Sequence, residues 1–358
     1  MQKHELDAPE LSHLRIVPRV VPHDRNARVR RTEAMTPSSS ANLRLGSFYA
    51  LVTSALLATQ EPFSALAAKH LNPLYFVCIT QAGLLFAVPL LTARRVSRHD
   101  FAILFSAPRN WSRLALLFVI GCSGLALYNL GLRNAHPIII AAILNLSPFW
   151  AALVARFISR KAIPISPFLF CACFFVAFVG AMLIAWSQIE DSSAASPDEL
   201  VKSLLHGSWK YAIPIPIFFA LSGTLVGHWF RELDESATMA ANFIVSAAVL
   251  IPGTLLAAYL WSVPAVPSDG KEAVLLLLIG TLSAAAAGRV FYQVALTVTD
   301  NDNGFVTMFF LLVPALSSLI SLPLSWSIPD LRFAAGPMFF GGLTLVAASL
   351  FIFSSRSW

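Results

Sequence analysis

The sequence predicts an all-α integral membrane protein with about ten transmembrane helices, arranged as two inverted repeats of five helices. Three observations predict this fold: an excess of apolar residues, a series of apolar stretches long enough to cross a bilayer, and an internal repeat. The chain has 358 residues, of which 57% are hydrophobic and 12% are charged. A soluble domain usually carries about twice that share of charge. A bilayer accounts for the imbalance, because lipid solvates apolar faces that water would not.

The apolar stretches give the expected helices in order. A transmembrane helix needs roughly 20 mostly apolar residues. The first half has such stretches at about residues 47–69, 73–93, 113–132, 137–158 and 164–188. The second half has them at about residues 211–231, 236–261, 273–296, 303–324 and 332–354. Residues 101–112 predict a shorter helix on the membrane surface.

These stretches divide the chain into five parts. The N-terminal part is polar, contains prolines and lacks the apolar segment of a signal peptide, so we expect a disordered, basic cytoplasmic tail. The polar segment between the two halves contains Ser196-Pro197-Asp198-Glu199, which predicts the start of a short amphipathic helix in an external loop. The expected parts are the tail (1–45), the first repeat (46–188), the external loop (189–210), the second repeat (211–354) and a cytoplasmic C-terminus (355–358).

The positive charges predict the orientation. With both termini in the cytoplasm, 18 of the 25 lysines and arginines lie on the cytoplasmic side and 6 outside, with Arg289 inside the membrane. We therefore expect a multi-pass protein of the inner (plasma) membrane. The formal net charge is +6. Because the cations are distributed among the segments between helices, nucleic acid is excluded as a partner.

An internal repeat relates the two halves. The segment from Gly124 to Leu132 matches the segment from Gly288 to Leu296 in the pattern Gly-x-x-x-Tyr-amide-x-small-Leu. Downstream, the segments that begin at Pro148 and at Pro314 also match, and the first helix aligns with the sixth when Ala58 is set on Ala220. Because five is odd, the second copy enters the membrane from the opposite side. Two inverted halves of this kind suit alternating access around a site near the midplane.

A sequence of this layout resembles the drug/metabolite transporter superfamily, in its EamA-type branch. The resemblance rests on Leu125-Ala-Leu-Tyr128, the segment from Pro148, their second-half counterparts and Lys69 at the end of the first helix. It extends from about residue 45 to residue 353. The family pattern often has a glutamate about thirteen residues after each proline, where this chain has Lys161 and Ser327. The resemblance implies secondary transport of small metabolites, frequently export.

Glu61 is the strongest candidate for a functional residue. It lies some 14 residues into the first apolar stretch, between Gln60 and Pro62. A charged side chain inside a membrane helix costs roughly 2.5–3.5 kcal/mol on insertion scales. Pro62 has no N–H for the carbonyl of Ala58, so we expect a kink here. Glu61 either binds a proton or substrate on a cavity wall, or it is a neutral side chain that bonds to a neighbouring helix.

The other candidates are polar side chains inside the apolar stretches. Arg289 either binds an anionic substrate group or extends its side chain to the interface. Paired aromatic and amide side chains near the midplane suit a small polar substrate, although each can instead bond between helices. The candidate substrate- or proton-binding residues are Gln60, Glu61, Tyr128, Asn129, Asn145, Arg289, Tyr292 and Gln293.

The function that these features predict is secondary transport of a small-molecule substrate, coupled to protons or to exchange, with export as the expected direction. We expect no catalytic residues, no cofactor and no metal, because the sequence has no Gly-rich phosphate loop and no zinc-ligand spacing. Two alternatives stay open: a scaffold or sensor that acts through its basic tail, and a membrane enzyme that acts on lipid-linked substrates. The sequence leaves open whether the protein works as a monomer or as a homodimer.

Overall fold

The computed structural model describes residues 40–134, 137–159, 165–188, 209–260, 270–298, 309–328 and 335–356. Within these ranges the chain is helical and contains no strand. Residues 1–39 of the predicted tail (1–45) and the short helix expected near Ser196 lie outside the described residues. The tail prediction was wrong for residues 40–45, because α2 begins at Ser40. The predicted all-α architecture is confirmed for the part of the chain that the structure describes.

The described helices follow the predicted apolar stretches. In the first half they are α2 (Ser40–Ala58), α3 (Gln60–His70), α4 (Pro73–Leu84), η1 (Leu85–Ala87), α5 (Val88–Leu91), α6 (Arg95–Ser106), α7 (Pro108–Asn134), α8 (Pro137–Leu144), α9 (Ser147–Ser159) and α10 (Pro167–Ser187). In the second half they are α12 (Trp209–Ala212), α13 (Ile215–Trp229), α14 (Glu235–Leu260), α15 (Gly270–Thr281), η2 (Leu282–Gly288), α16 (Arg289–Val298), η3 (Phe309–Leu312), α18 (Val313–Ser327) and α19 (Pro337–Arg356).

The helices form a membrane-embedded bundle. Among the described residues, seven helices are long and apolar enough to cross a membrane, and Val313–Trp326 and Pro337–Phe353 are shorter apolar helices. Large apolar side chains also lie on the outside, as at Phe157 (82% exposed) and Phe168 (84%). Lipid, unlike water, solvates such a surface without cost. The predicted membrane protein is therefore confirmed at this level, while the count of ten helices stays a prediction.

In three of the predicted helices, a helical segment ends four residues before a proline. A proline ring clashes with the carbonyl four residues earlier and cannot donate to it. The residue four before Pro62 is Ala58, where α2 ends; the residue four before Pro148 is Leu144, where α8 ends. Pro216 and Ala212, at the end of α12, show the same relation. The first predicted helix is thus interrupted at Thr59, next to the residue whose carbonyl Pro62 leaves without a helical partner.

The surface helix α6 lies earlier in the chain than predicted. It spans Arg95–Ser106 rather than residues 101–112, and α7 begins at Pro108 rather than near residue 113. Ala107 has extended backbone angles, φ −96° and ψ 118°. A residue that precedes proline disfavours the helical conformation, so the boundary falls at Ala107.

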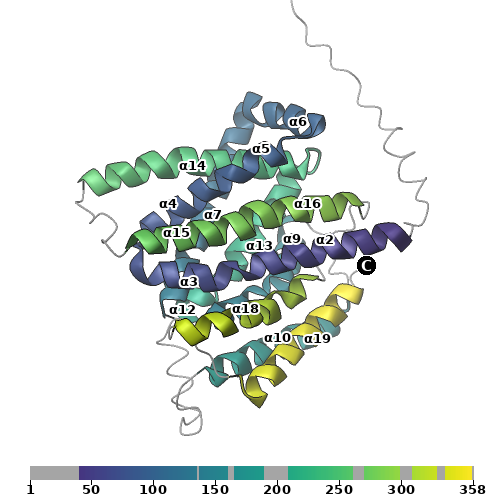
Figure 1. The fold of residues 1–358 in the computed structure, drawn as a ribbon. Helices are drawn as coiled ribbons and strands as arrows, with labels where there is room; N and C mark the ends of the chain where they lie inside the picture. The colour runs from purple at the N-terminus through teal and green to yellow at the C-terminus, as the bar shows by residue number, and fades with distance from the viewer. Residues whose placement is uncertain are drawn as a thin grey trace, which may run out of the picture. The chain divides into compact units, whose positions relative to one another are not determined.

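The packing brings helices from the two halves side by side. In Figure 1, α10 lies along α19, α3 along α15, and α2 along α16. The backbones of α10 and α19 approach each other closely: an ideal Cβ on Gly180 would stand 2.6 Å from the carbonyl oxygen of Gly342. Gly341 has nothing within 4 Å of such a Cβ. On α19, therefore, the close approach to α10 requires a glycine at position 342 and not at position 341.

Candidate functional site

The break in the first helix is the starting point of the site. α2 ends at Ala58 and α3 begins at Gln60, with Glu61 in its first turn. The hydroxyl of Thr59, at the break, lies 2.5 Å from the hydroxyl of Ser283, and the two form a hydrogen bond. Ser283 belongs to η2, a π-helical segment that contacts both α2 and η1. π-Helical turns are rare and occur frequently at functional sites.

Glu61 is buried and faces α7. Its side chain is 5% exposed, and its Oε2 has no hydrogen-bond partner among the described residues. The carboxyl group interacts electrostatically with Tyr128 of α7, which is 2% exposed and whose hydroxyl also lacks a partner. Ser64, one turn after Glu61, is near the same hydroxyl but does not meet it in hydrogen-bond geometry. The structure therefore brings Glu61 and Tyr128 together.

More buried polar side chains lie on the helices around this pair. α3, α4, α7 and α15 pack against one another. Six buried side chains on these helices each have at least one oxygen or nitrogen atom without a hydrogen-bond partner in the described structure. We call these six side chains the polar core. They are Glu61, Thr80, Gln81, Tyr128, Asn129 and Thr281.

The polar core is chemically suited to a small polar ligand. A buried polar group without a partner costs about 1–3 kcal/mol, so native structures contain few of them. Hydroxyl, amide and carboxyl groups can together donate and accept hydrogen bonds, and the Glu61 carboxyl can also exchange a proton. The ring of Phe76 stands 6.4 Å from that of Tyr128 and forms part of the apolar wall. The surrounding cluster is otherwise aliphatic, which favours hydrogen bonding inside it.

Arg289 and Tyr292 lie in a different place from Glu61. Both are on α16, where Arg289 is exposed and Tyr292 is buried against Ala50 and Ala295. Their electrostatic partner is Glu235, the first residue of α14. The candidates therefore form two groups, one around Glu61 and one around Arg289.

Of the remaining candidates, Asn129 belongs to the polar core, whereas Gln60, Asn145 and Gln293 lie at separate positions. Gln60 is half-buried, and its backbone packs on Gly280 of α15, whose ideal Cβ would be 3.7 Å from the Gln60 carbonyl oxygen. Asn129 is fully buried but follows Tyr128 by one residue, so it points about 100° away around α7. Asn145 lies at the break between α8 and α9, half-buried, with its Nδ2 unpartnered in the described structure. Gln293 is half-buried on α16.

Sequence reasoning missed Glu235, Ser64 and Thr281. Ser64 could have been found from its position three residues after Glu61, because residues three apart in a helix lie on the same face. Glu235 follows a five-residue loop at the membrane surface, where an acidic residue is ordinary, so nothing local distinguished it. Thr281 enters the polar core because α4 approaches α15 closely, with an ideal Cβ on Gly83 only 2.8 Å from the Thr281 methyl group.

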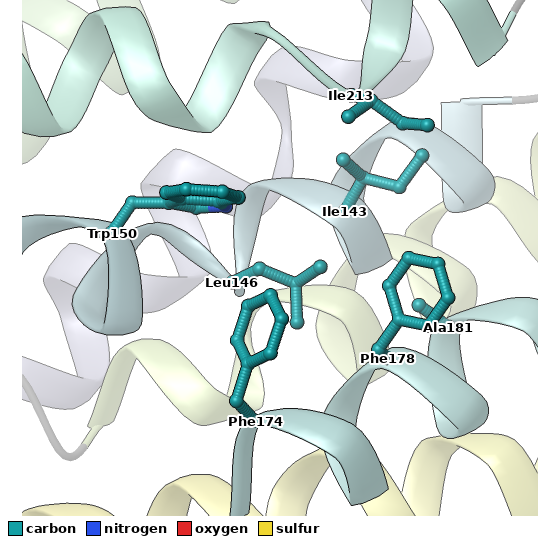
Figure 2. A pocket seen from close by; sticks show the side chains of 7 residues that line it. All are labelled: Ile143, Leu146, Trp150, Phe174, Phe178, Ala181 and Ile213. Carbon is teal, nitrogen blue, oxygen red and sulfur yellow. The ribbon is translucent and has the colours of Figure 1, made fainter. Parts of the chain in front are cut away.

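A small apolar pocket lies apart from the polar core. Figure 2 shows it between α8, α9 and α10, with Ile213 at its edge. Its lining consists of Ile143, Leu146, Trp150, Phe174, Phe178, Ala181 and Ile213. No residue of the polar core lines this pocket.

Potential metal-ligating side chains do not cluster in the described ranges. No three histidine, cysteine, aspartate or glutamate side chains there form a group that could hold a metal ion. The four cysteines are free, with Cys173 buried and Cys171 exposed.

Comparison with known proteins shows the fold and no family. No family model matches the chain, and no curated protein matches it. Six solved chains do match. One of them, described only as a crystal structure of a protein, aligns with a TM-score of 0.53 and 14% sequence identity, over 88% of this chain and 98% of its own length. At this identity the likeness shows a shared fold alone.

Proposed function

We propose that this protein is a secondary transporter that moves a small polar metabolite across the membrane by alternating access, with Glu61 as its proton- or substrate-binding group. The observation that supports this most is the polar core. Six buried polar side chains, each with an atom that has no partner in the described structure, lie on four neighbouring helices of an otherwise apolar bundle. Intramembrane ionisable residues are expensive and are retained mainly for function.

The pairing of helices supports an arrangement in two inverted repeats. Three pairs join a helix to its proposed counterpart in the other half: α10 with α19, α4 with α14, and α8 with α18. Other pairings occur twice, as a two-fold relation requires. The contact of α3 with α15 corresponds to that of α13 with α7, and the contact of α2 with α18 to that of α13 with α9.

The repeat is also supported at single residues. Gly124 and Gly288 occupy equivalent positions in the sequence repeat, and Leu57 is equivalent to Phe219 when Ala58 is set on Ala220. An ideal Cβ on Gly288 would lie 3.5 Å from Leu57, and one on Gly124 would lie 3.7 Å from Phe219. Equivalent glycines thus contact equivalent side chains of the other half. On this basis, we also propose membership of the EamA-type branch of the drug/metabolite transporter superfamily.

Broken helices support a site near the Glu61 carboxyl. Transporters commonly place substrate and coupling ions where membrane helices are interrupted, because the freed backbone groups become available there. The break at Thr59 contacts the π-helical segment η2, and η2 contacts the 3₁₀ turn η1. Three spans therefore depart from regular α-helix around one location, which gives the bundle points at which helices can bend.

The decisive experiment is counterflow in proteoliposomes with a pooled extract of small metabolites. The vesicles contain wild-type protein, Glu61→Gln, or the matched control Glu272→Gln, which removes an exposed carboxyl from the first turn of α15. We expect wild type and control to accumulate a substrate in a pH-dependent manner. Glu61→Gln should reduce uptake at least about tenfold, equivalent to ~1.4 kcal/mol, and remove the pH dependence.

Two results would contradict the proposal. If folded wild-type protein accumulates nothing beyond empty vesicles, the scaffold or sensor alternative replaces transport. If Glu61→Gln transports as well as wild type at every pH, transport stands but Glu61 is only a structural contact.

A further inference from the structure

The surface helix α6 is fixed to the bundle by its inner face. Its buried side chains are Ser97 and Leu104, and Phe101 and Phe105 pack partly beneath it. These apolar side chains join a cluster that includes residues of α7, α13 and α14. α6 therefore lies over the ends of three helices and connects α5 to α7.

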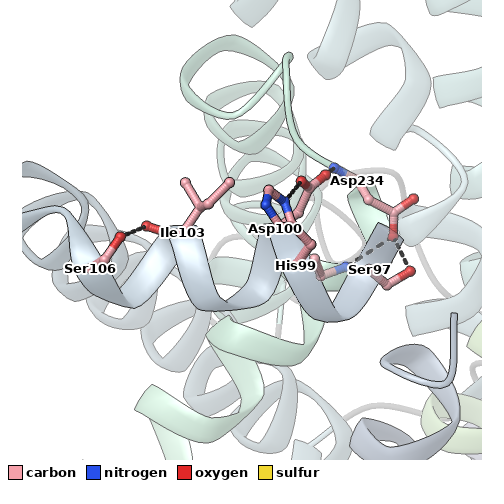
Figure 3. A network of polar contacts seen from close by, with 7 residues as sticks. Ser97, His99, Asp100, Ile103, Ser106 and Asp234 are labelled. Carbon is pink, nitrogen blue, oxygen red and sulfur yellow. Dashed lines mark hydrogen bonds and ion pairs between the residues drawn. The ribbon is translucent and has the colours of Figure 1, made fainter. Parts of the chain in front are cut away.

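Polar contacts set the rotation of α6 about its axis. Figure 3 shows the Ser97 hydroxyl donating to Asp234 Oδ2 at 2.7 Å, while the backbone N–H of Asp234 donates to Asp100 Oδ2 at 2.8 Å. Asp234 also accepts from the backbone N–H of Ala237, 3.3 Å away, which satisfies the first turn of α14. Because α6 is held on this face, its other face points away from the bundle.

The outer surface formed by α6 and the first turn of α7 is strongly basic. From Arg94 to Arg113 the sequence contains five arginines and one aspartate, a formal charge of +4 with His99 neutral. Arg95, Arg98 and Arg109 are exposed, whereas the one acidic residue, Asp100, is used on the inner face. The positive charge of this surface is thus not neutralised by acidic residues of its own segment.

Apolar side chains lie among these arginines. Val96 and Ile103 of α6 are 65% and 38% exposed, and Trp111 in the first turn of α7 is 49% exposed. A surface that presents both cations and exposed apolar groups, including a tryptophan, is typical of the membrane interface. α6 also directly joins two candidate membrane spans, Pro73–Leu91 and Pro108–Asn134, so it lies at the level where the lipid headgroups begin.

We infer that the outer surface formed by α6 and the first turn of α7 binds the headgroups of anionic phospholipids through Arg95 and Arg98 of α6 and Arg109 of α7. The planar guanidinium group of arginine matches a phosphate with two parallel hydrogen bonds. Val96, Ile103 and Trp111 enter the boundary between headgroups and acyl chains beside them. This inference depends on the membrane location of the bundle and not on the proposed transport.

The test measures lipid binding to the full-length protein in nanodiscs made of phosphatidylcholine alone or mixed with phosphatidylglycerol. Hydrogen exchange of residues 95–106 reports on α6, and native mass spectrometry counts retained phosphatidylglycerol. The test variant is Arg95→Gln, Arg98→Gln and Arg109→Gln combined. The matched control is Arg133→Gln, Lys210→Gln and Lys271→Gln, which removes three exposed cations that are not on α6.

We expect phosphatidylglycerol to slow exchange in α6 of the wild type and of the control, and high salt to reverse the effect. In the test variant, the affinity for phosphatidylglycerol should fall about fivefold for each arginine removed, given the usual contribution of a surface cation. An equal loss in the control would overturn the inference, as would equal protection by phosphatidylcholine alone. Equal protection by soluble glycerol phosphate would show an anion site that does not need a lipid, and would also overturn it.

Discussion

At the residue scale, Glu61 and Tyr128 are buried side chains on the packed helices α3 and α7, and each has a polar atom without a hydrogen-bond partner in the described structure. Such groups cost stability unless a ligand or water satisfies them. A purely structural pair would be expected to satisfy these atoms by hydrogen bonds within the protein. Substitutions in this pair should therefore weaken transport while leaving the free energy of unfolding unchanged or raising it.

Tyr128→Phe separates these two effects. Removing a hydroxyl that has no partner should leave the free energy of unfolding unchanged or raise it by up to about 1 kcal/mol. The same change should raise the Michaelis constant for transport, because the ligand loses a hydrogen bond. Thermal unfolding in detergent and uptake by proteoliposomes measure the two quantities. Tyr259→Phe, at a side chain 83% exposed, is the control.

A large loss of stability in Tyr128→Phe would contradict this interpretation. It would mean that the hydroxyl bonds within the protein, with Ser64 as the nearest candidate, and that the pair holds the helices together.

At the element scale, α10 and α19 approach each other closely. This approach depends on two glycines without side chains, one on each helix. Small residues allow backbones to approach in membranes, where packing replaces the hydrophobic effect as the driving force. This contact joins the last helices of the two proposed repeats.

Gly180→Ala should destabilise the protein, because its new Cβ would stand 2.6 Å from a backbone oxygen that cannot rotate away. Overpacking of this kind costs about 1–3 kcal/mol. Gly341→Ala, at a glycine with open space around it, should be neutral or stabilising by up to about 1 kcal/mol through helix propensity. Melting temperatures in detergent compare the two, and a similar loss in both would contradict the close contact.

The elements also show how far sequence patterns reach. The length of the apolar stretches predicted where the helices lie, and Pro62 predicted the break in the first one. Both features depend only on residues that are neighbours in the chain. α6 begins about six residues earlier than predicted. Its first turn, Arg95 to Arg98, contains three polar side chains and so was not read as part of an apolar stretch. The contact of Ser97 with Asp234, which holds this turn against the bundle, is visible only in the structure.

At the scale of the whole molecule, the inverted arrangement makes a definite prediction about sidedness. In a background without the four native cysteines, Ser106→Cys and Arg231→Cys should react with a membrane-impermeant reagent only from the cytoplasm. Lys69→Cys and Lys271→Cys should react only from outside. All four positions are exposed. Labelling of Arg231→Cys from outside would mean that the second half has the opposite orientation, and the repeat would not be inverted.

The sequence by itself determined the membrane location, the all-α class and the approximate position of each described helix. In a bilayer every backbone group must bond within its own segment, so local apolar length is sufficient for these features. It also identified Glu61, because a carboxyl group in an apolar stretch is conspicuous without any structure.

Only the tertiary structure decided which polar side chains meet. Glu61 lies with Tyr128, whereas Arg289 and Tyr292 lie with Glu235, a residue that no motif distinguished. The rotation of each helix and its choice of neighbours depend on packing between segments more than a hundred residues apart, as at Gly180 and Gly342. Those contacts are absent from local composition, because they arise only when all helices pack at once.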